Sequence, residues 1–495
     1  MFETAELGHK LSKSDFNAQV PELRENLLAI QRQLKSASFP VLILLNGVDG
    51  AGKGETANLL NEWLDARLLE THAFGVPTQD ELERPRFWRY WMRTPPHGRI
   101  GLYLNNWYTH PIITRVMDNA SDEALAKDLA QIRNFEQALA DDGALIIKFW
   151  FHLSKKVQKK RLKKLSEDRA TSWRISDDDW KRFKRYDEFR AVSERALRDT
   201  STSAAPWTVV EGANARYRAF TVGRHILERV ERHLASHAKT TRSAPPDPGV
   251  PDPLTILDAI DLTKDISDDK YEHQLERLKG RLNRLSRKVR ATGLSCVIVF
   301  EGWDAAGKGG AIRRMITALD ARQYRVIPIS APTPEERAQH YLWRFWRHIP
   351  RPGRFTVYDR SWYGRVLVER VEGFASRADW GRAYSEINAF EEQLVDADTV
   401  LLKFWLHISA EEQLRRFKER EATPYKAHKI GPEDYRNREK RNLYESAAED
   451  MVSHTSTAAA PWVLLSAESK HWARIQVLTH VCEAIEARLK ALKRR

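Results

Sequence analysis

The 495-residue sequence has few cysteines, no long apolar run and no excess of acidic charge. Its two cysteines, Cys296 and Cys482, are too few for a disulfide framework or a cysteine-based metal site, and such scarcity is typical of a reducing compartment. Apolar runs such as Val41–Leu45 are far too short to span a bilayer, and residues 1–10 do not resemble an export signal. We therefore expect a cytoplasmic protein with no membrane partner.

The composition is that of a large folded protein with a basic surface. Hydrophobic residues make up 42% of the chain and charged residues 30%, and 495 residues exceed a single hydrophobic core, which predicts at least two domains. Lys and Arg number 81 against 68 Asp and Glu, a formal charge of +13. This charge favours a polyanionic partner such as nucleic acid, an anionic membrane or a phosphate-rich substrate, without choosing among them.

The most informative feature is an internal repeat. The segment Gly47–Gly54 (GVDGAGKG) recurs as Gly302–Gly309 (GWDAAGKG), and 302 − 47 gives a displacement of 255 positions. The same displacement relates Trp107-Tyr108 to Trp362-Tyr363, Lys148-Phe149-Trp150 to Lys403-Phe404-Trp405, and Pro206-Trp207 to Pro461-Trp462. So long a displacement indicates a duplicated domain. We predict an N-terminal domain at residues 1–239, a Pro-rich linker at 240–254 and a C-terminal domain at 255–495.

Each copy predicts an α/β fold. In the second copy, apolar residues at spacings of three and four between Leu275 and Val289 predict an amphipathic helix. Short apolar segments separated by helical ones predict strands at residues 296–300, 324–329, 355–358, 399–404 and 462–465. This alternation predicts a parallel sheet sandwiched by helices, with ligands bound at the carboxyl ends of the strands.

A phosphate-binding loop is predicted between the first strand and the next helix of each copy. Residues 302–308 match G-x-x-x-x-G-K, in which Gly302, Gly307 and Gly309 let backbone N–H groups face phosphate oxygens and Lys308 reaches the terminal phosphates. The Ser or Thr that usually follows the lysine and holds magnesium is Gly309 here. Asp304 in the loop and Asp359 at a strand end are the candidate metal ligands instead, with a helix-capping role as the alternative for Asp359.

Three motifs carry a resemblance to the polyphosphate kinase type 2 family: residues 300–310 (FEGWDAAGKGG), 358–365 (YDRSWYGR) and 457–462 (TAAAPW). The resemblance covers both halves of the chain and implies two tandem P-loop kinase-like domains, each with a helical lid. Fused, two-copy members of this family move the terminal phosphoryl group of inorganic polyphosphate to AMP, giving ADP and shortened polyphosphate. The resemblance therefore implies polyphosphate and AMP as partners and Mg²⁺, with Mn²⁺ as an alternative, as cofactor.

The resemblance also implies roles for particular residues. Asp304 and Asp359 would position the metal and the reacting phosphates, and Lys308, Arg360 and Arg420 would contact polyphosphate. Lys426 and Lys429 would lie in the lid, where His428 stands at a position that the family usually fills with tryptophan.

The repeat allows the two copies to be compared position by position. The counterparts of Asp359, Arg360, Ser361, Arg420 and Lys426 are, in order, Leu104, Asn105, Asn106, Leu165 and Thr171. The first copy keeps Asp49 and Lys53, but leucine can neither ligate a metal nor pair with phosphate. We expect the second copy to catalyse and the first to act as a packing partner or a polyphosphate-holding surface.

The segment Trp343–His348 (WRFWRH) alternates aromatic and basic residues, which can stack a base and hold phosphates. The alternative is that its tryptophans belong to the core, because aromatics recur at the same places in the first copy. Arg347 corresponds to Met92, which makes it the better functional candidate of the two arginines.

Three alternatives to polyphosphate-to-AMP transfer stay open from the sequence. One is polyphosphate-dependent phosphorylation of nucleoside diphosphates, and another is an ATP-dependent nucleotide kinase on the same fold. The third is a nucleic-acid-binding protein with a vestigial loop, but no recognition motif supports it, so no nucleic-acid partner is expected. The duplication also suggests a homo-oligomer built from pairs of two-domain chains.

Overall fold

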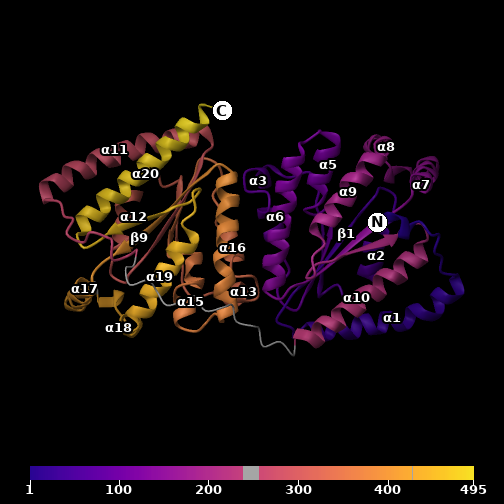
Figure 1. Cartoon of the computed structure of the whole chain (residues 1–495), viewed down its shortest axis with the longest axis horizontal. Helices are drawn as coiled ribbons and strands as arrows, with labels where there is room; N and C mark the ends of the chain where they lie inside the picture. The colour runs from indigo at the N-terminus through magenta and orange to yellow at the C-terminus, as the bar shows by residue number, and fades with distance from the viewer. Residues whose placement is uncertain (238–255, 426, 495) are drawn as a thin grey trace. The chain divides into compact units, whose positions relative to one another are not determined.

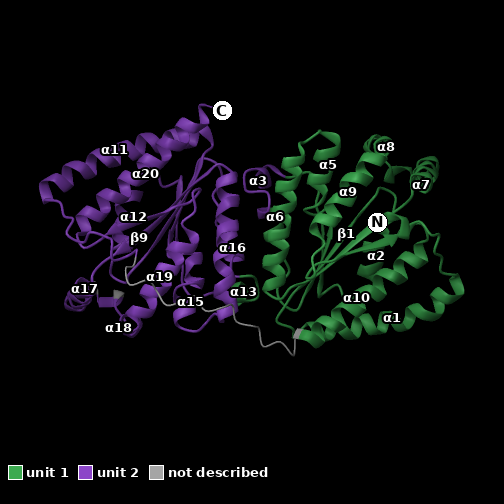
Figure 2. Cartoon of the chain, viewed as in Figure 1, with its two compact units in different colours: residues 1–77, 89–241, 334–340 green, residues 78–88, 242–333, 341–495 purple. Residues whose placement is uncertain are grey.

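The computed structural model describes residues 1–237, 256–425 and 427–494, which form two compact units (Figures 1 and 2). Unit 1 consists of residues 1–77, 89–241 and 334–340, and unit 2 of residues 78–88, 242–333 and 341–495. Each unit thus contains most of one sequence copy and a short segment of the other. The linker expected at residues 240–254 lies outside the described residues.

Unit 1 is built on a five-stranded sheet in the order β2-β3-β1-β4-β5, and its paired strands are parallel. The strands are β1 (Val41–Gly47), β2 (Leu69–Ala73), β3 (Ile100–Leu104), β4 (Leu145–His152) and β5 (Trp207–Glu211). Its long helices are α1 (Lys13–Leu34), α2 (Lys53–Trp63), α5 (Thr109–Met117), α6 (Asp122–Asp141), α7 (Lys155–Glu167), α8 (Asp177–Lys184), α9 (Tyr186–Thr200) and α10 (Ala215–His237). Helices α1, α2 and α10 pack together on one face of the sheet, and α5, α6 and α9 on the other (Figure 1).

Unit 2 repeats this plan with the order β10-β9-β6-β8-β7, so β6 is the central strand. Its strands are β6 (Ser295–Gly302), β7 (Tyr324–Pro328), β8 (Phe355–Asp359), β9 (Thr399–His407) and β10 (Trp462–Ser466). Its long helices are α11 (Asp268–Thr292), α12 (Lys308–Ile316), α16 (Arg377–Asp396), α17 (Ala410–Ala422), α18 (Pro432–Glu439), α19 (Arg441–Thr455) and α20 (Lys470–Leu492). Helices α11, α12 and α20 cover one face of the sheet, and α16 and α19 the other.

Single helical turns connect the longer elements. They are η1 (Phe2–Ala5), α3 (Gln79–Leu82), α4 (Trp88–Trp91), η2 (Ser172–Arg174), α13 (Pro334–Arg337), α14 (Trp343–Trp346), η3 (Trp362–Arg365), α15 (Val368–Val371) and η4 (Ala427–Lys429).

The predicted α/β fold is confirmed, and so are the five strands predicted in the second copy. The helix expected around Leu275–Val289 is α11, and its apolar positions are buried against the sheet side of the unit. It ends at Gly293, whose φ of 72° is the left-handed conformation that commonly terminates helices.

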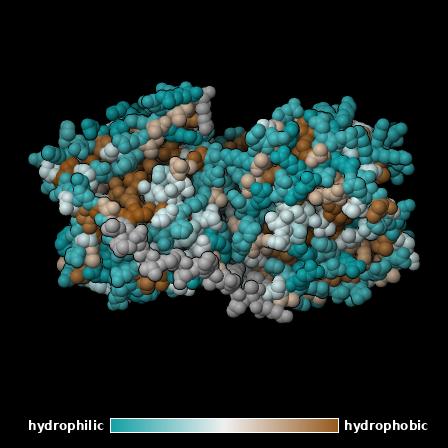
Figure 3. Space-filling view, viewed as in Figure 1, coloured by the Kyte–Doolittle hydropathy of each residue, from teal (hydrophilic) through white to brown (hydrophobic). Residues whose placement is uncertain are grey.

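Hydrophilic residues cover most of the face seen in Figure 3. None of the helices in the described ranges combines the length and apolar composition needed to cross a bilayer.

A buried ion pair explains several of the motifs that recur in both copies. In unit 2 the Lys403 ammonium donates hydrogen bonds to Glu391 Oε2 (2.7 Å), the Tyr363 hydroxyl (2.9 Å) and the Thr455 carbonyl (2.8 Å). Trp362 Nε1 donates to the other oxygen of the same carboxylate at 3.0 Å. Every donor of the lysine is used, which is the condition under which a buried charge is tolerated.

Unit 1 contains the same network around Lys148 Nζ, which lies 2.7 Å from Glu136 Oε2 and donates to the Thr200 carbonyl at 2.8 Å. In unit 1 the network connects β4 to α6 and to the end of α9. In unit 2 it connects β9 to α16 and to the end of α19. The repeated Lys-Phe-Trp and Trp-Tyr motifs are therefore structural.

Replacing Glu391 with Ala leaves Lys403 buried without its counter-charge, so we expect the unfolding free energy of unit 2 to fall by about 3–5 kcal/mol. The double variant Glu391→Met, Lys403→Met removes both charges and should be clearly more stable than the single variant. Thermal and urea denaturation measure both effects. As a control, Arg281→Ala breaks the exposed Arg281–Glu486 pair and should cost at most about 1 kcal/mol. A double variant as unstable as Glu391→Ala would contradict this account.

Candidate functional site

The glycine-rich loop of unit 2 joins the central strand β6 to helix α12. Gly302 has a φ of 135°, and a Cβ at this position would lie 2.3 Å from the Leu406 carbonyl oxygen of β9, so only glycine fits. Gly307, the residue before α12, has a φ of 107°, and a Cβ there would have no neighbour within 4 Å. The loop thus turns tightly on the strand side and leaves open space beside the helix N-terminus, where phosphate groups are typically bound.

Lys308, the first residue of α12, folds back over the loop. Its ammonium donates hydrogen bonds to the Gly302 carbonyl (2.7 Å) and the Trp303 carbonyl (3.1 Å). Burial lowers the pKa of Lys308, and the nearby Asp304 carboxylate opposes that shift. In unit 1, Lys53 makes the equivalent hydrogen bonds to the Gly47 and Val48 carbonyls.

Asp304 lies inside the loop and is held from two sides. Arg360 donates to its Oδ1 at 3.1 Å, and the Asn437 side-chain amide of α18 donates to its Oδ2 at 3.0 Å. Burial alone would raise the pKa of Asp304, but the positive charges of Lys308 and Arg360 and the Asn437 hydrogen bond keep this pKa below its usual value. Asp304 is therefore ionised at neutral pH.

Asp359 ends strand β8 next to the loop. The parallel register pairs Asp359 with Phe300 of β6, so the loop and the end of β8 leave the sheet side by side. Its Oδ2 lies 3.7 Å from the point where a Cβ on Gly309 would stand. The carboxylate therefore lies beside the position that holds Ser or Thr in the usual loop. The capping alternative does not hold, because Ser361 is the residue that caps η3, its hydroxyl accepting from Tyr363 N.

Arg360 adopts a strained backbone conformation with a φ of 64°, a left-handed value that side chains other than Asn and Asp rarely take. Its counterpart Asn105 has a φ of 51° at the same place in unit 1. The scaffold thus imposes this conformation in both units, and asparagine suits it better. An arginine in a backbone conformation that disfavours it indicates that its guanidinium is needed at this place.

Sequence reasoning missed Glu301, the residue before the loop. Its buried carboxylate, 5% exposed, accepts a hydrogen bond from the Ser361 hydroxyl at 2.8 Å. Burial raises the pKa of Glu301, against the Ser361 hydrogen bond and the charges of Lys308 and Arg360. In unit 1 the same bridge is made by two amides, Asn46 and Asn106, at 3.1 Å. Both partners differ between the two copies, and a search for pairs of positions that change together could have identified them.

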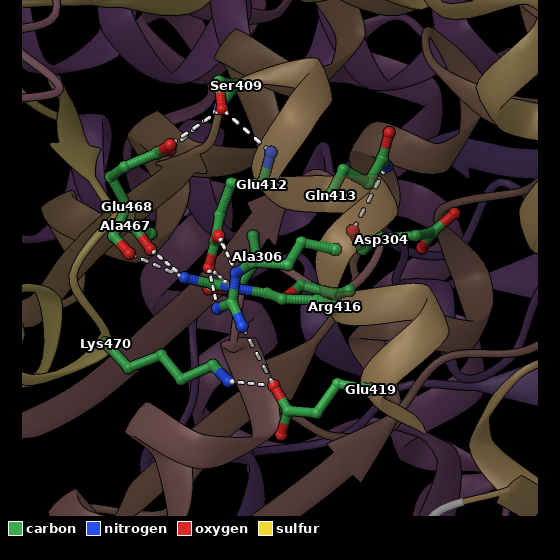
Figure 4. Close-up of polar contacts among 12 residues, drawn as sticks. Asp304, Ala306, Ser409, Glu412, Gln413, Arg416, Glu419, Ala467, Glu468 and Lys470 are labelled. Atoms are coloured by element: carbon green, nitrogen blue, oxygen red, sulfur yellow. Dashed lines mark hydrogen bonds and ion pairs between the residues drawn. The ribbon is translucent and has the colours of Figure 1, made fainter. Parts of the chain in front are cut away.

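Arg416 of α17, also missed, supports the loop from behind (Figure 4). Its side chain is 2% exposed and donates to the Ala305 and Ala306 carbonyls at 3.0 Å each and to the Ala467 carbonyl at 2.7 Å. One turn earlier, Gln413 donates to the Asp304 carbonyl at 3.2 Å. These contacts fix the loop backbone against α17. The recurrence of both residues in the first copy, as Arg161 and Gln158, was a sequence signal for a shared structural role.

Two of the remaining predicted residues lie on helices that follow β9 along the chain. Arg420 is in the last turn of α17, Lys429 ends η4, and Lys426 lies outside the described residues. The structure connects the loop to α18 through Asn437, which sequence reasoning did not single out.

Arg347 directly follows α14, and its guanidinium covers the Trp343 ring at 4.8 Å from the centroid. Trp343, Phe345 and Trp346 are buried, as the structural interpretation of this segment predicted.

Unit 1 presents the altered version of the site. Its loop aspartate, Asp49, accepts a hydrogen bond from Arg182 Nε at 2.7 Å, and Arg182 occupies the position of Asn437. Leu104 and Asn105 replace Asp359 and Arg360. The one retained loop carboxylate is therefore neutralised by a fixed guanidinium from α8 and has no second carboxylate beside it.

A magnesium ion bound to phosphates needs only one or two protein carboxylates, because it keeps several waters and takes phosphate oxygens as further ligands. Within the described ranges, no group of three or more His, Cys, Asp or Glu side chains is arranged to hold a metal. Asp304 and Asp359 of unit 2, both carboxylates beside a phosphate loop, fit the smaller requirement. Asp49 of unit 1 is a single carboxylate that is already paired with Arg182, and it has no second carboxylate beside it.

Comparison with known proteins gives a consistent result. The family model described as Polyphosphate kinase 2 matches the chain twice, over residues 10–238 and 265–493, which repeats the displacement seen in the sequence. A protein of Pseudomonas aeruginosa named polyphosphate:AMP phosphotransferase is 52% identical over 493 residues, covering 99% of both chains. One of the same name from Acinetobacter johnsonii is 36% identical over 480 residues, covering 96% of this chain and 97% of the relative.

Other relatives match in part or in structure. A GDP-polyphosphate phosphotransferase of Mycobacterium tuberculosis is 37% identical over 221 residues, which cover 45% of this chain and 75% of the relative. A crystal structure of a candidate polyphosphate kinase 2 from Pseudomonas aeruginosa superposes with a TM-score of 0.90 at 51% identity and covers 99% of both chains. With both copies matched and relatives similar along the full length, the chain belongs to the polyphosphate kinase 2 family.

Proposed function

We propose that the protein transfers the terminal phosphoryl group of inorganic polyphosphate to AMP, giving ADP and polyphosphate shortened by one unit. The observation that carries this proposal is the cluster of Asp304, Lys308, Asp359 and Arg360 around an open phosphate loop. The full-length relatives named polyphosphate:AMP phosphotransferase support AMP as the acceptor. We assign the reaction to a C-terminal domain at residues 255–495 and a supporting role to an N-terminal domain at residues 1–239.

The residues of unit 2 suit phosphoryl transfer, which depends mainly on in-line positioning and on neutralising the charge of the transferred group. Backbone N–H groups of the loop and the Lys308 ammonium would hold the terminal phosphates of polyphosphate. Arg360, which is held by its hydrogen bond to Asp304, would contact a further oxygen of the same phosphates. We also assign Arg420, Lys426 and Lys429 of the lid, and Arg347, to binding of the polyanion or the nucleotide.

Asp304 and Asp359 would hold Mg²⁺, or Mn²⁺ in its place. When bound, the ion supplies positive charge to the phosphate oxygens. The attacking oxygen on AMP needs no dedicated base, because the second ionisation of a phosphate monoester lies near about pH 6. We therefore assign these two carboxylates to metal binding and orientation rather than to proton transfer.

The direct test is product analysis after mixing the purified protein, Mg²⁺ and polyphosphate with AMP, ADP or GDP in separate reactions free of ATP. ADP formed from AMP is the expected result. Product from the diphosphates alone would favour the activity that the relative from Mycobacterium tuberculosis is named for. Turnover only after ATP is supplied would identify an ATP-dependent nucleotide kinase and contradict the proposal.

If only the second copy catalyses, variants in the two units should have different effects on activity. Asp359→Ala removes a carboxylate from the cluster, so kcat should fall by at least about 10²–10³-fold, as for other lost charge-stabilising groups. Asp49→Ala removes the counterpart of Asp304 in unit 1, where Arg182 already neutralises it, and should retain most of the activity. Steady-state ADP formation measures both. Loss of activity in Asp49→Ala with retention in Asp359→Ala would contradict the assignment.

Replacing the Glu301–Ser361 bridge by its unit 1 counterpart should reduce activity without unfolding the protein. The double variant Glu301→Asn, Ser361→Asn copies the amide pair of unit 1, so the structural bridge stays while the carboxyl group beside Lys308 and Arg360 is lost. We expect kcat to fall about 10–100-fold, the usual effect of removing a supporting residue, with little change in melting temperature.

The converse substitution in unit 1, Asn106→Ser, changes the same bridge away from the proposed centre and should leave kcat unaffected. Wild-type turnover in the Glu301/Ser361 double variant would show that the bridge is structural only.

A further inference from the structure

Helix α7 of unit 1, labelled in Figure 1, carries an unusual run of positively charged residues. Its bases are Lys155, Lys156, Lys159, Lys160, Arg161, Lys163 and Lys164, and its only acidic residue is Glu167. The corresponding helix of unit 2, α17, mixes its bases with four acids: Glu411, Glu412, Glu419 and Glu421. The duplication therefore shows that this fold does not require the lysine run.

Helix stability does not explain the run either. The first turn of α7 has no acidic residue but contains Lys155 and Lys156, which face the positive end of the helix dipole. Lysines four positions apart, such as Lys156 with Lys160 and Lys160 with Lys164, repel each other along the helix. Helix α11 is also basic, but it begins with Asp268 and Asp269 and ends with Arg290, the order that the dipole favours.

The contacts of α7 place the lysines on its outer face. The inner face is fixed by Gln158, which donates to the Asp49 carbonyl at 3.0 Å, and by Leu162, which is fully buried beside Gly50. The helical repeat puts Lys156, Lys160 and Lys164 on the side opposite these two residues and Lys159 at its edge, and all four are exposed. We call these four residues the lysine face.

The lysine face is short of counter-charges. Lys155 pairs with Asp187, and Lys163 lies 3.6 Å from Glu167. Across the parts of the chain that the structure describes, no carboxylate forms an ion pair with any residue of the lysine face. Four exposed ammonium groups on a single helix, repelling one another and lacking acidic partners, form a surface that a bound polyanion would stabilise.

We propose that the lysine face binds the polyphosphate chain at a site separate from the loop of unit 2. This inference rests on the proposed function for its choice of ligand. Inorganic polyphosphate is a linear polymer whose charges repeat at every unit, and a row of lysines, each a mobile point charge, matches it without a fixed geometry. Helix α7 contains no aromatic residue on which a base could stack, so this face favours a phosphate polymer over a nucleic acid.

Such binding is governed by release of counter-ions, so it should weaken steeply as salt rises. The site would raise the local concentration of long chains and leave the chemical step unchanged. Short chains release fewer counter-ions on binding, so they would gain little from it.

The test compares two variants of the full-length protein that remove the same charge. The first replaces the lysine face (Lys156→Gln, Lys159→Gln, Lys160→Gln, Lys164→Gln). The control replaces four exposed bases of α11 (Arg277→Gln, Arg284→Gln, Arg287→Gln, Lys288→Gln). For the lysine-face variant we expect KM for long-chain polyphosphate to rise about tenfold, with kcat and the KM for short chains unchanged. The control should stay within about twofold of wild type for both donors.

Direct binding of long-chain polyphosphate, without AMP, tests the site independently of turnover. The lysine-face variant should bind more weakly than wild type and lose part of the salt dependence. Equal losses in both variants, or no loss in either, would overturn the proposal, as would reduced binding of single-stranded DNA with polyphosphate binding intact. Absence of ADP formation by the wild-type protein would contradict the proposed function, whereas this binding comparison would still decide the role of the lysine face.

Discussion

The site depends on the parallel pairing of β6 with β8. This register sets Phe300 opposite Asp359, so the phosphate loop and the strand that ends in Asp359 and Arg360 leave the sheet at adjacent points. Asp304 then lies within reach of Arg360, and Asp359 within reach of the Gly309 position. A shift of one residue would turn these side chains to the opposite face of the sheet. The proposed catalytic cluster is thus a consequence of strand order and register, with α17 and α18 holding it in place.

The two units show how one scaffold can keep or lose a charged site. Both keep the strand order, the glycine-rich loop, the folded-back lysine and the buried Lys–Glu network, which are the features that the fold needs. What differs is the charge around the loop. Unit 2 surrounds Asp304 with Arg360, Asp359 and a neutral amide, whereas unit 1 neutralises Asp49 with Arg182 and replaces the Glu–Ser bridge by two asparagines. Unit 1 therefore keeps the fold but lacks the charges of the proposed centre.

Much of this could be predicted from the sequence, because strands, helices and the phosphate loop are local patterns. The apolar segments at residues 296–300 and 355–358 are strands in the structure, and the Gly302–Lys308 motif is a loop between strand and helix. The residues that sequence reasoning missed act through contacts between distant segments. Asn437 reaches Asp304 across 133 positions, and Arg416 reaches the Ala305 carbonyl across 111. For an asparagine or arginine on a charged helix, the neighbouring residues in the sequence do not predict such a contact.

The internal repeat was the most useful guide within the sequence, because it separated what the fold requires from what the site requires. Lys148 and Lys403, which recur in both copies, belong to the core network, whereas Asp359 and Arg360, which the first copy lacks, belong to the proposed centre. Glu301 and Ser361 change together between the copies, so the same comparison, applied to pairs, would have identified them.

The central claim is that the two carboxylates of unit 2, and not the single one of unit 1, hold the metal and the reacting phosphates. Crystals grown with Mn²⁺, AMP and polyphosphate would test it most directly, since the anomalous scattering of manganese locates the ion. The account predicts an anomalous peak next to Asp304 and Asp359 and none at Asp49. A peak at Asp49, or none beside Asp304 and Asp359 while polyphosphate occupies the loop, would contradict it.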